Sequence, residues 1–201
     1  MKKEKLTWAL ICICFLFAGT APSYEIGDVV ADFKLKNVDG KMISLSDYKS
    51  GKGVILIFDC NTCPYSRAYN DRIIELHKKY ASQGFPVITI NPNNPELSPG
   101  DSFSAMAERA KSKNYSFPYL VDETQSVARS FGASNTPHVF VLKNDAKDFK
   151  VAYIGTIDNN SRDASAATKK YVEEAVTALL ENKAIATTRT KAIGCGIKWK
   201  D

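Results

Sequence analysis

Two cysteines, at positions 60 and 63, are the residues of this chain best suited to chemistry. They stand in the stretch DCNTCP, which covers positions 59–64. Two thiols separated by two residues can bind a metal, form a structural disulfide, or exchange electrons by thiol–disulfide chemistry. The elements that surround the pair decide among these three uses.

A purely structural disulfide is disfavoured by the length of the loop that it would close. On the chain-entropy estimate, a Cys60–Cys63 bridge is worth about 2 kcal/mol, whereas a bridge from either cysteine to Cys195 would be worth about 5 kcal/mol. The chain has 201 residues, of which 44% are hydrophobic, so it can build a core without disulfides. Selection for stability alone would not choose the short bridge.

A zinc site would need more ligands than the pair supplies. Past the first two dozen residues, the other imidazole and thiol ligands are His77, His138 and Cys195, and the chain has no second Cys-x-x-Cys. Copper(I) accepts a few thiolates plus an imidazole. We therefore expect no cofactor and no resident metal, and we keep a copper(I)-binding chaperone that uses Cys60, Cys63 and His138 as an alternative function.

The context of the pair favours electron exchange. Positions 53–58 (GVILIF) are apolar after the glycine, which is typical of a strand buried on both faces. Positions 64–83 have the apolar spacing of a helix, with Gly84 as its stop. At such a strand-to-helix junction, free N–H groups and the helix dipole stabilise a thiolate. We predict that Cys60, ahead of the helix, attacks, and that Cys63, inside the first turn, resolves the mixed disulfide.

Strands and helices alternate along the rest of the chain. An Asp-Gly turn within positions 31–45 predicts an N-terminal β-hairpin. The alternation predicts an α/β fold with a central mixed β-sheet flanked by helices. Further strands are predicted at 85–91, 117–122, 138–145 and 149–155, and further helices at 102–113, 123–132 and 165–183.

The order of these elements resembles a known family. Hairpin, strand, Cys-x-x-Cys-Pro, helix, strand and then NTPHVFV resemble the thioredoxin-like superfamily, and positions 27–60 are similar to its redoxin (AhpC/TSA) branch. CNTCPYS and the terminal IGCGIKWK are similar to a peroxiredoxin-like group of thioredoxin-family proteins with a CxxC motif. The resemblance runs from Tyr24 to Trp199. It implies a thioredoxin-like fold and a thiol-disulfide oxidoreductase that works through Cys60 and Cys63, with thiol peroxidase as an alternative activity.

The resemblance also implies roles for the residues around Pro137. It implies a cis Thr136–Pro137 bond that places Pro137 beside the cysteine pair, where it shapes the path of the substrate. His138, the next residue, is either a solvated residue at a strand start or a group that tunes the pKa of Cys60.

Two further residues are auxiliary candidates. Arg67, one turn past Cys63, is either a counter-charge for the thiols or a surface arginine. Cys195 lies between two glycines. It is either a third redox partner, which the glycines would allow to approach closely, or a free thiol on a docked tail.

The chain departs from the family pattern at three positions. Val54 stands where thioredoxins carry a buried carboxylate, and Asp59 replaces the usual aromatic residue before the first cysteine. A carboxylate there would raise the pKa of Cys60 by repulsion, while offering a base. Peroxiredoxins carry a threonine three residues before the reactive cysteine; Cys60 stands three before Cys63, and Ile57 three before Cys60. This departure disfavours efficient peroxidase activity.

The amino-terminal segment has the pattern of an export signal. MKKEK is basic, and the apolar run from Leu6 to Ala18 is shorter than the roughly 20 residues of a membrane-spanning helix. We expect a cleaved signal peptide at 1–23, a thioredoxin-like domain at 24–183, and a tail at 184–201 that carries Cys195. The expected location is periplasmic or secreted, where thiols oxidise readily.

The charge pattern narrows the class of partner. The formal net charge is only +5, and no run of Lys or Arg is interleaved with aromatic residues. Nucleic acid is therefore a poor candidate. The expected partners are cysteine-containing client proteins or a membrane electron donor, with no stable membrane anchor.

Overall fold

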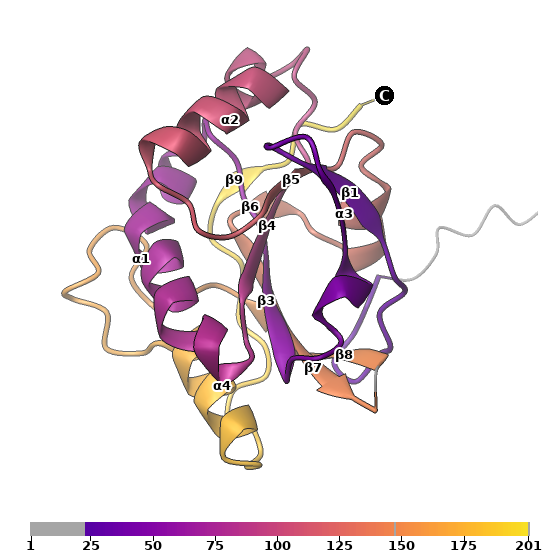
Figure 1. Ribbon diagram of the computed structural model, residues 1–201. Helices are drawn as coiled ribbons and strands as arrows, with labels where there is room; N and C mark the ends of the chain where they lie inside the picture. The colour runs from indigo at the N-terminus through magenta and orange to yellow at the C-terminus, as the bar shows by residue number, and fades with distance from the viewer. Residues whose placement is uncertain (1–22, 147, 201) are drawn as a thin grey trace, which may run out of the picture.

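The computed structural model describes residues 23–146 and 148–200, so the predicted signal peptide lies, up to residue 22, outside the described residues. A central sheet of seven strands has the order β2-β1-β5-β4-β3-β7-β8. Helices cover it on both sides (Figure 1). The strands of this sheet are β1 (Lys34–Asn37), β2 (Met42–Ser44), β3 (Gly53–Phe58), β4 (Val87–Asn91), β5 (Tyr119–Val121), β7 (His138–Asp145) and β8 (Asp148–Gly155).

The sheet is mixed, as the sequence predicted. Strand β4 pairs in parallel with both β3 and β5, whereas β7 pairs antiparallel with β3, and β1 antiparallel with β5. The predicted hairpin is formed by β1 and β2. The helices are α1 (Pro64–Tyr80), α2 (Phe103–Ser112), α3 (Ser126–Phe131) and α4 (Tyr171–Leu180), with 3-10 turns at Leu45–Tyr48, Ala81–Gln83 and Pro99–Asp101.

Strand β3 lies inside the core and is buried along its whole length. Because side chains alternate along a strand, Leu56 and Phe58 face one apolar cluster, which includes Phe131 of α3. Ile55 and Ile57 face the opposite cluster, to which α1 and α4 contribute. This two-sided burial is why the strand reads as an uninterrupted apolar run.

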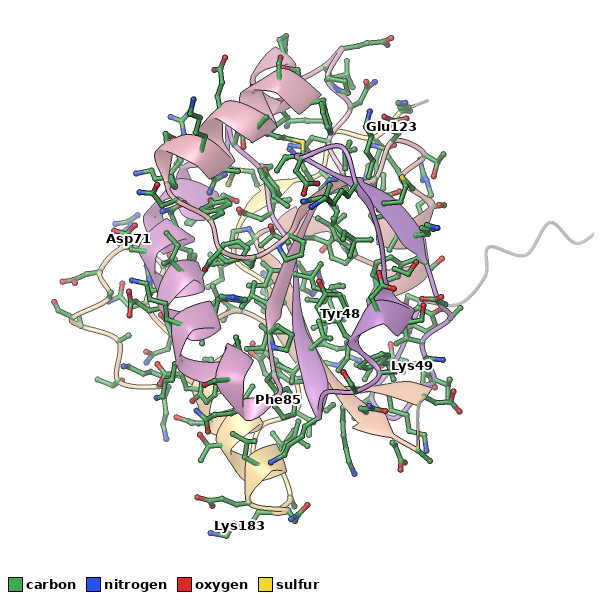
Figure 2. All side chains as sticks on the ribbon, in the orientation of Figure 1. Tyr48, Lys49, Asp71, Phe85, Glu123 and Lys183 are labelled. Carbon is green, nitrogen blue, oxygen red and sulfur yellow. The ribbon has the colours of Figure 1, made fainter. Side chains whose placement is uncertain are left out.

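Side-chain packing closes the start of strand β3. At its start, a side chain on Gly53 would come within 2.2 Å of the ring of Phe85, so this end is closed by packing. Figure 2 shows Phe85 in the lower part of the molecule, above Lys183, and Glu123 in the upper part. Strand β3 ends where α1 begins, and Gly84, in the left-handed conformation at φ +94°, follows the 3-10 turn after α1.

Helix α4 begins at Tyr171, six residues later than the sequence predicted. The segment before it forms a turn instead, because the Asn159 side-chain oxygen accepts hydrogen bonds from the backbone N–H groups of Thr168 and Lys169. A local side-chain partner of this kind competes with helix formation.

The tail after α4 returns to the domain and adds a second, two-stranded sheet that the sequence did not predict. Strand β9 (Cys195–Gly196) pairs antiparallel with β6 (Asn135–Thr136). The two strands lie side by side in Figure 1. Ile197 follows β9 and is buried in the core. Across residues 23–146 and 148–200, no helix is both long enough and apolar enough to cross a membrane.

Candidate active site

Strand β3 and helix α1 position the two cysteines of the motif. Cys60 follows β3, and Cys63 is the residue that caps the N-terminus of α1. Both are reduced in the structure, and only 1% and 2% of their surfaces are exposed. The expectation that Cys63 lies inside the first helical turn is wrong by one position, because the helix starts at Pro64. Proline suits that position, since its fixed φ fits a first turn and its missing N–H is not needed there.

Strand β6 and the cis Thr136–Pro137 peptide face both sulfurs. The cis bond implied by the resemblance is confirmed, and Pro137 is buried. The Thr136 hydroxyl lies 2.9 Å from Cys60 Sγ. The Cys63 thiol, when protonated, donates to the Thr136 carbonyl oxygen at 3.1 Å. Thr136 therefore contacts both cysteines.

The thiolate is favoured on Cys63 and disfavoured on Cys60. A hydrogen bond from the Cys60 thiol lowers the pKa of Cys63 to about 7, against the opposing effect of burial, and the Ser66 backbone N–H also favours the thiolate. The same Cys60–Cys63 bond is the largest reason why the pKa of Cys60 is raised; burial and the charge of Asp59 add to it. These directions favour Cys63 over Cys60 as the attacking thiolate, the reverse of the predicted roles, and which cysteine attacks stays a prediction.

Asp59 is a buried carboxyl group next to the pair. It is 1% exposed and lies 3.2 Å from Arg109 Nη2. Among the described residues, neither of its carboxylate oxygens has a hydrogen bond of good geometry. Burial raises the pKa of Asp59, although the charge of Arg109 and the hydroxyl of Ser66 both act to lower it. A carboxyl group with a raised pKa at this place can take up or release a proton.

Ser66 connects Asp59 with Cys60. It is fully buried on α1, and its Oγ lies 3.9 Å from Cys60 Sγ. Its hydroxyl also interacts with the carboxylate of Asp59. The sequence contains Ser66 within CNTCPYS, but the spacing alone did not reveal this contact.

Arg109 of α2 is a site residue that the sequence reasoning missed. Its guanidinium donates to the carbonyl oxygen of Cys60 as well as pairing with Asp59. Arg67, the predicted counter-charge, instead donates from Nε to the Asn61 carbonyl oxygen at 2.9 Å. Both arginines line a pocket of about 350 Å³ together with Lys113, so the surface beside the motif is cationic.

Asp101 holds the two residues between the cysteines. Its carboxylate accepts from the Asn61 backbone N–H at 2.6 Å and from the Thr62 hydroxyl at 2.7 Å. It also accepts from Ser98, Asn91 and Asn93. Although burial acts to raise the pKa of Asp101, these hydrogen bonds lower it below its ordinary value. The ionised group therefore fixes the conformation of the loop that carries the thiols.

His138 is buried away from the sulfurs. Its Nδ1 accepts a long hydrogen bond from the Ser134 backbone N–H, and its ring centroid lies 4.7 Å from that of Phe140. Burial lowers the pKa of His138 to about 4, so the expectation of a solvated residue is wrong. In the part of the chain that the structure describes, no group of three His, Cys, Asp or Glu side chains could hold a metal ion. The copper set of Cys60, Cys63 and His138 is therefore not assembled.

Cys195, the third cysteine of the described chain, lies beside the pair. In strand β9 it stands opposite Thr136, whose carbonyl oxygen accepts from the Cys63 thiol at 3.1 Å. The Cys195 thiol acts to raise the pKa of Cys63, and its backbone N–H acts to lower it. It is half-buried, unlike the other two cysteines.

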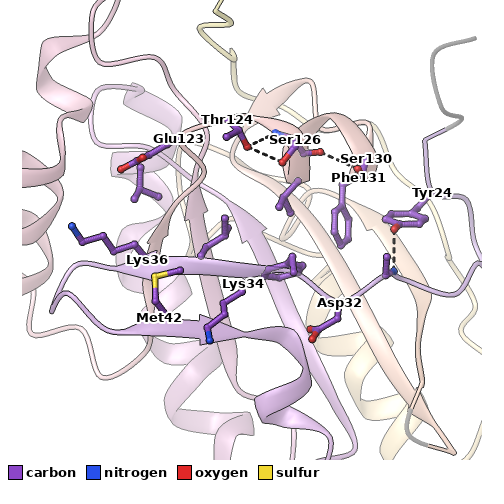
Figure 3. Close-up of a pocket in the computed structure, with 15 residues that line it drawn as sticks. Tyr24, Asp32, Lys34, Lys36, Met42, Glu123, Thr124, Ser126, Ser130 and Phe131 are labelled. Atoms are coloured by element: carbon purple, nitrogen blue, oxygen red, sulfur yellow. Dashed lines mark hydrogen bonds between the residues drawn. The ribbon is translucent and has the colours of Figure 1, made fainter. Parts of the chain in front are cut away.

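A larger pocket of about 560 Å³ lies elsewhere, between β1 and α3 (Figure 3). Its lining includes Lys34, Lys36 and Met42 on one side, and Glu123 and Phe131 on the other. None of its described lining residues is a cysteine, so it is separate from the thiol site.

A Cys-x-x-Cys pair at a strand-to-helix junction, facing a cis-proline, defines the class of thioredoxin-like oxidoreductases, and this chain is one of them. The chain belongs to the AhpC/TSA family, whose model matches residues 26–160. It is 30% identical over 150 residues to the thiol-disulfide oxidoreductase ResA of Bacillus subtilis (strain 168), covering 71% of this chain and 79% of that protein. The predicted membership of the redoxin branch and the predicted fold are thereby confirmed.

Two solved structures have the same fold over nearly the whole chain. An uncharacterized conserved protein from Geobacillus kaustophilus superposes with a TM-score of 0.82 at 34% identity, covering 88% of this chain and 93% of that one. A hypothetical protein from Sinorhizobium meliloti 1021 also gives a TM-score of 0.82, at 30% identity, and covers 89% of this chain and 97% of that one.

Proposed function

We propose that this protein is an exported thiol-disulfide oxidoreductase that exchanges electrons through Cys60 and Cys63, with Pro137 shaping the groove for the substrate. The observation that carries the proposal is the pair of buried cysteines between β3 and α1, both in contact with Thr136 beside the cis-proline. The pKa of Cys63 is lowered to about 7, which favours its thiolate. A thiolate, unlike a thiol, can attack a disulfide.

The exchange takes two steps when the client is reduced. The Cys63 thiolate attacks one sulfur of a client disulfide, which forms a mixed disulfide and releases the other client sulfur as a thiolate. Cys60, once deprotonated, then attacks Cys63 Sγ, forms the Cys60–Cys63 disulfide and releases the second client thiolate. Two electrons pass to the client and two protons follow them. The same steps in reverse oxidise a client dithiol, and the reduction potential of the pair sets the direction.

Asp59 and Ser66 serve the second step. Cys60 must lose a proton before it attacks, and its raised pKa makes this loss the difficult event. The Ser66 Oγ lies 3.9 Å from Cys60 Sγ, and the same hydroxyl acts to lower the pKa of Asp59. A carboxylate with a raised pKa, connected through a hydroxyl, accepts such a proton more readily than an ordinary exposed carboxylate. Asp59 thus takes the place of the buried acid that Val54 cannot supply.

The partners of this reaction carry cysteines. The relative from Bacillus subtilis is a thiol-disulfide oxidoreductase by name, which supports exchange with cysteine-containing molecules. Client proteins or a membrane electron donor in the periplasm or the extracellular space fit this chemistry, because disulfides persist in oxidising compartments.

Reduction of insulin disulfides by dithiothreitol tests the proposal. Wild type should accelerate the reaction, and Cys63→Ser should return it to the uncatalysed rate. Cys60→Ser combined with Cys195→Ser, which leaves Cys63 as the one thiol at the site, should stall as a mixed disulfide with insulin, visible on a non-reducing gel. Equal rates for wild type and Cys63→Ser, with both proteins folded by circular dichroism, would sink the proposal. A glutathione titration then gives the reduction potential of the pair, which sets the direction of electron flow. A potential of about −270 mV indicates a reductant, and one of about −120 mV indicates an oxidant.

Thiol peroxidase is the second candidate, and one contact favours it. The sequence has no threonine three residues before either cysteine, but the Thr136 hydroxyl reaches Cys60 Sγ from strand β6 at 2.9 Å. Stopped-flow oxidation of the reduced protein by hydrogen peroxide separates the two functions. A peroxidase must react far faster than free cysteine at the same pH, and a rate equal to that of free cysteine rejects this candidate.

A further inference from the structure

We propose that Cys195 is a third redox thiol, which exchanges disulfides with Cys63 and so carries electrons between the buried pair and molecules in solution. The inference rests on the proposed exchange through Cys60 and Cys63. It identifies Cys195 Sγ as the sulfur that a thiol of another molecule attacks.

The register of the small sheet places Cys195 at the pair. Strand β9 sets Cys195 directly opposite Thr136, the residue that contacts Cys60 Sγ with its hydroxyl and accepts from Cys63 with its carbonyl group. The thiol and the backbone N–H of Cys195 both act on the pKa of Cys63, in opposite directions, which agrees with this register. Cys63 therefore has Cys60 and Cys195 as neighbouring thiols.

The residues on either side of Cys195 hold it in this place. Gly194 lies so close to the cis peptide that a side chain there would come within 2.2 Å of the Thr136 carbonyl oxygen. Its own carbonyl oxygen accepts from the Asn135 side chain at 3.0 Å. On the other side, the Ile197 backbone N–H donates to the Ser134 carbonyl oxygen. A thiol fixed beside its partner reacts as if it were present at high concentration.

The tail is also anchored beyond this strand. The Lys198 backbone N–H donates to the Asn93 side chain at 2.9 Å, and the Lys198 carbonyl oxygen accepts from the Gln125 side chain at 2.8 Å. Ile197 is only 7% exposed. Cys195 is therefore part of the folded domain, and the contacts of the tail fix its position.

The burial of Cys60 and Cys63 is the reason why a third, more accessible thiol would assist the exchange. Cys60 and Cys63 are 1% and 2% exposed, and β9 covers the strand that faces them. An attacking thiolate must approach a disulfide along the line of the sulfur–sulfur bond, which is difficult for a protein when both sulfurs are buried. Cys195 is half-buried, so its sulfur is more accessible to a partner than either sulfur of the pair.

The exchange step balances without an outside oxidant. Starting from the Cys60–Cys63 disulfide, the Cys195 thiolate attacks Cys63 Sγ. The Cys60–Cys63 bond breaks, the Cys63–Cys195 bond forms, and Cys60 keeps the electron pair and takes up the proton that Cys195 released. One thiolate of a partner dithiol then attacks Cys195 Sγ, forms a partner–Cys195 disulfide and releases Cys63 as a thiolate. The second partner thiolate attacks the first partner sulfur and releases Cys195 as a thiolate, so the partner leaves as a disulfide and the two electrons reach the protein.

The test is a disulfide map of the reduced full-length protein after mild oxidation with oxidised glutathione. In Cys60→Ser, we expect Cys63 and Cys195 to link, which joins tryptic peptide 53–67 to peptide 192–198 in the mass spectrum. Cys60→Ser combined with Cys195→Ser removes that linked peptide. Absence of the link in Cys60→Ser, while both thiols still react with a thiol reagent, would overturn the proposal.

Two glycine variants test whether the docked strand delivers Cys195. Gly194→Ala places a methyl group against the Thr136 carbonyl oxygen, whereas a side chain at Gly196 meets nothing within 4 Å. In the Cys60→Ser background, Gly194→Ala should lower the yield of the linked peptide by about tenfold or more, since small displacements of reacting groups cost that much. Gly196→Ala should leave the yield unchanged. Equal yields in the two variants would contradict the proposal.

Insulin turnover separates this inference from the function on which it rests. If wild type catalyses insulin reduction and the Cys63–Cys195 link does not form, only the third thiol is refuted. If wild type does not catalyse insulin reduction at all, the exchange through Cys60 and Cys63 is itself refuted, whatever the disulfide map shows.

Discussion

Two buried arginine–aspartate pairs flank helix α1, and their aspartates differ in hydrogen bonding. Asp158 accepts from Arg72 Nη1 at 2.7 Å, from the Tyr69 hydroxyl at 3.1 Å and from the Asn160 backbone N–H at 2.9 Å. This pair ties α1 to the loop after β8. Each carboxylate oxygen has a donor, as buried charges in stable structures generally do.

Asp59 is even more deeply buried and has less support. Its side chain is 1% exposed against 4% for Asp158, yet its only charged partner in the described chain is Arg109, at 3.2 Å. Neither oxygen of Asp59 has a well-formed hydrogen bond within the described residues. The comparison teaches that the pair beside the thiols is not built for maximum stability. An acid that lacks donors gains more from taking up a proton, which is what thiol exchange requires.

Breaking the two pairs should give the largest effect. At pH 7, Arg109→Met and Arg72→Met should each lower the free energy of unfolding by about 3–5 kcal/mol, because each leaves a buried carboxylate without its cation. Urea unfolding with circular dichroism measures the loss.

The pH dependence should distinguish the two variants. Burial has already raised the pKa of Asp59 above its ordinary 3.8, and loss of Arg109 raises it further. A raised pKa means that folding favours the protonated form, so the cost of Arg109→Met is smallest below 3.8 and grows as the pH rises towards 7. Arg72→Met should show a flatter profile, since Tyr69 and Asn160 still donate hydrogen bonds to Asp158. Parallel profiles would contradict the comparison.

The next effect concerns the rate of exchange. Asp59→Asn should slow the release of insulin from the mixed disulfide by about 100-fold, as expected when a proton acceptor is removed. Asp158→Asn should change this rate by less than about twofold, because that pair does not touch the thiols. Single-turnover kinetics with quenched samples measure the step. Ser66→Ala, which alters no charge, should slow the same step. An unchanged rate in both Asp59→Asn and Ser66→Ala would refute the proton path.

A smaller effect is expected on the ionisation of Cys63. In wild type, the rate of iodoacetamide labelling at Cys63 should rise with pH and level off above about 7, since only the thiolate reacts. Cys60→Ala removes the hydrogen-bond donor and should shift this profile towards the ordinary value of 9.0, whereas Cys60→Ser keeps a donor and should shift it less. Asp158→Asn should leave the profile in place. Peptide mass spectrometry assigns the label, and a wild-type midpoint near 9.0 would contradict the structure.

The smallest effect is expected at an exposed pair. Glu75 and Lys78 are 68% and 61% exposed and lie 2.8 Å apart on α1. Glu75→Gln should leave the unfolding midpoint and the exchange rate unchanged within error, because solvent screens such pairs. A measurable loss would show that α1 depends on surface charge as well as on its two buried pairs.

The fold was largely predictable because it depends on local patterns. The strand at Gly53–Phe58 has the predicted bounds, since a short unbroken apolar run between a glycine and a polar motif is typical of a buried strand. The helix after Cys63 was predicted from its proline and its apolar spacing. The start of α4 was predicted too early, because a single side chain, Asn159, holds the preceding residues in a turn.

The polar half of the site was not predictable from spacing. Arg109 lies 49 residues from Cys60 in the sequence, and its contact depends on how α2 crosses the end of the sheet. Asp101 reaches Asn61 from the 3-10 turn at Pro99–Asp101, for which the sequence analysis predicted no element. Such contacts depend on how whole elements pack together, and no local periodicity in the sequence predicts them.

The sequence by itself determined that two cysteines stand where a buried strand meets a helix, because hydrophobic periodicity and helix caps act over a few neighbouring residues. Only the tertiary structure decided the surroundings of the two sulfurs, because the carboxyl group of Asp59, the hydroxyl of Thr136 and the depth of burial come from the packing of distant segments. It also decided that Cys195 returns to Cys63, because strand pairing between distant segments depends on the whole fold.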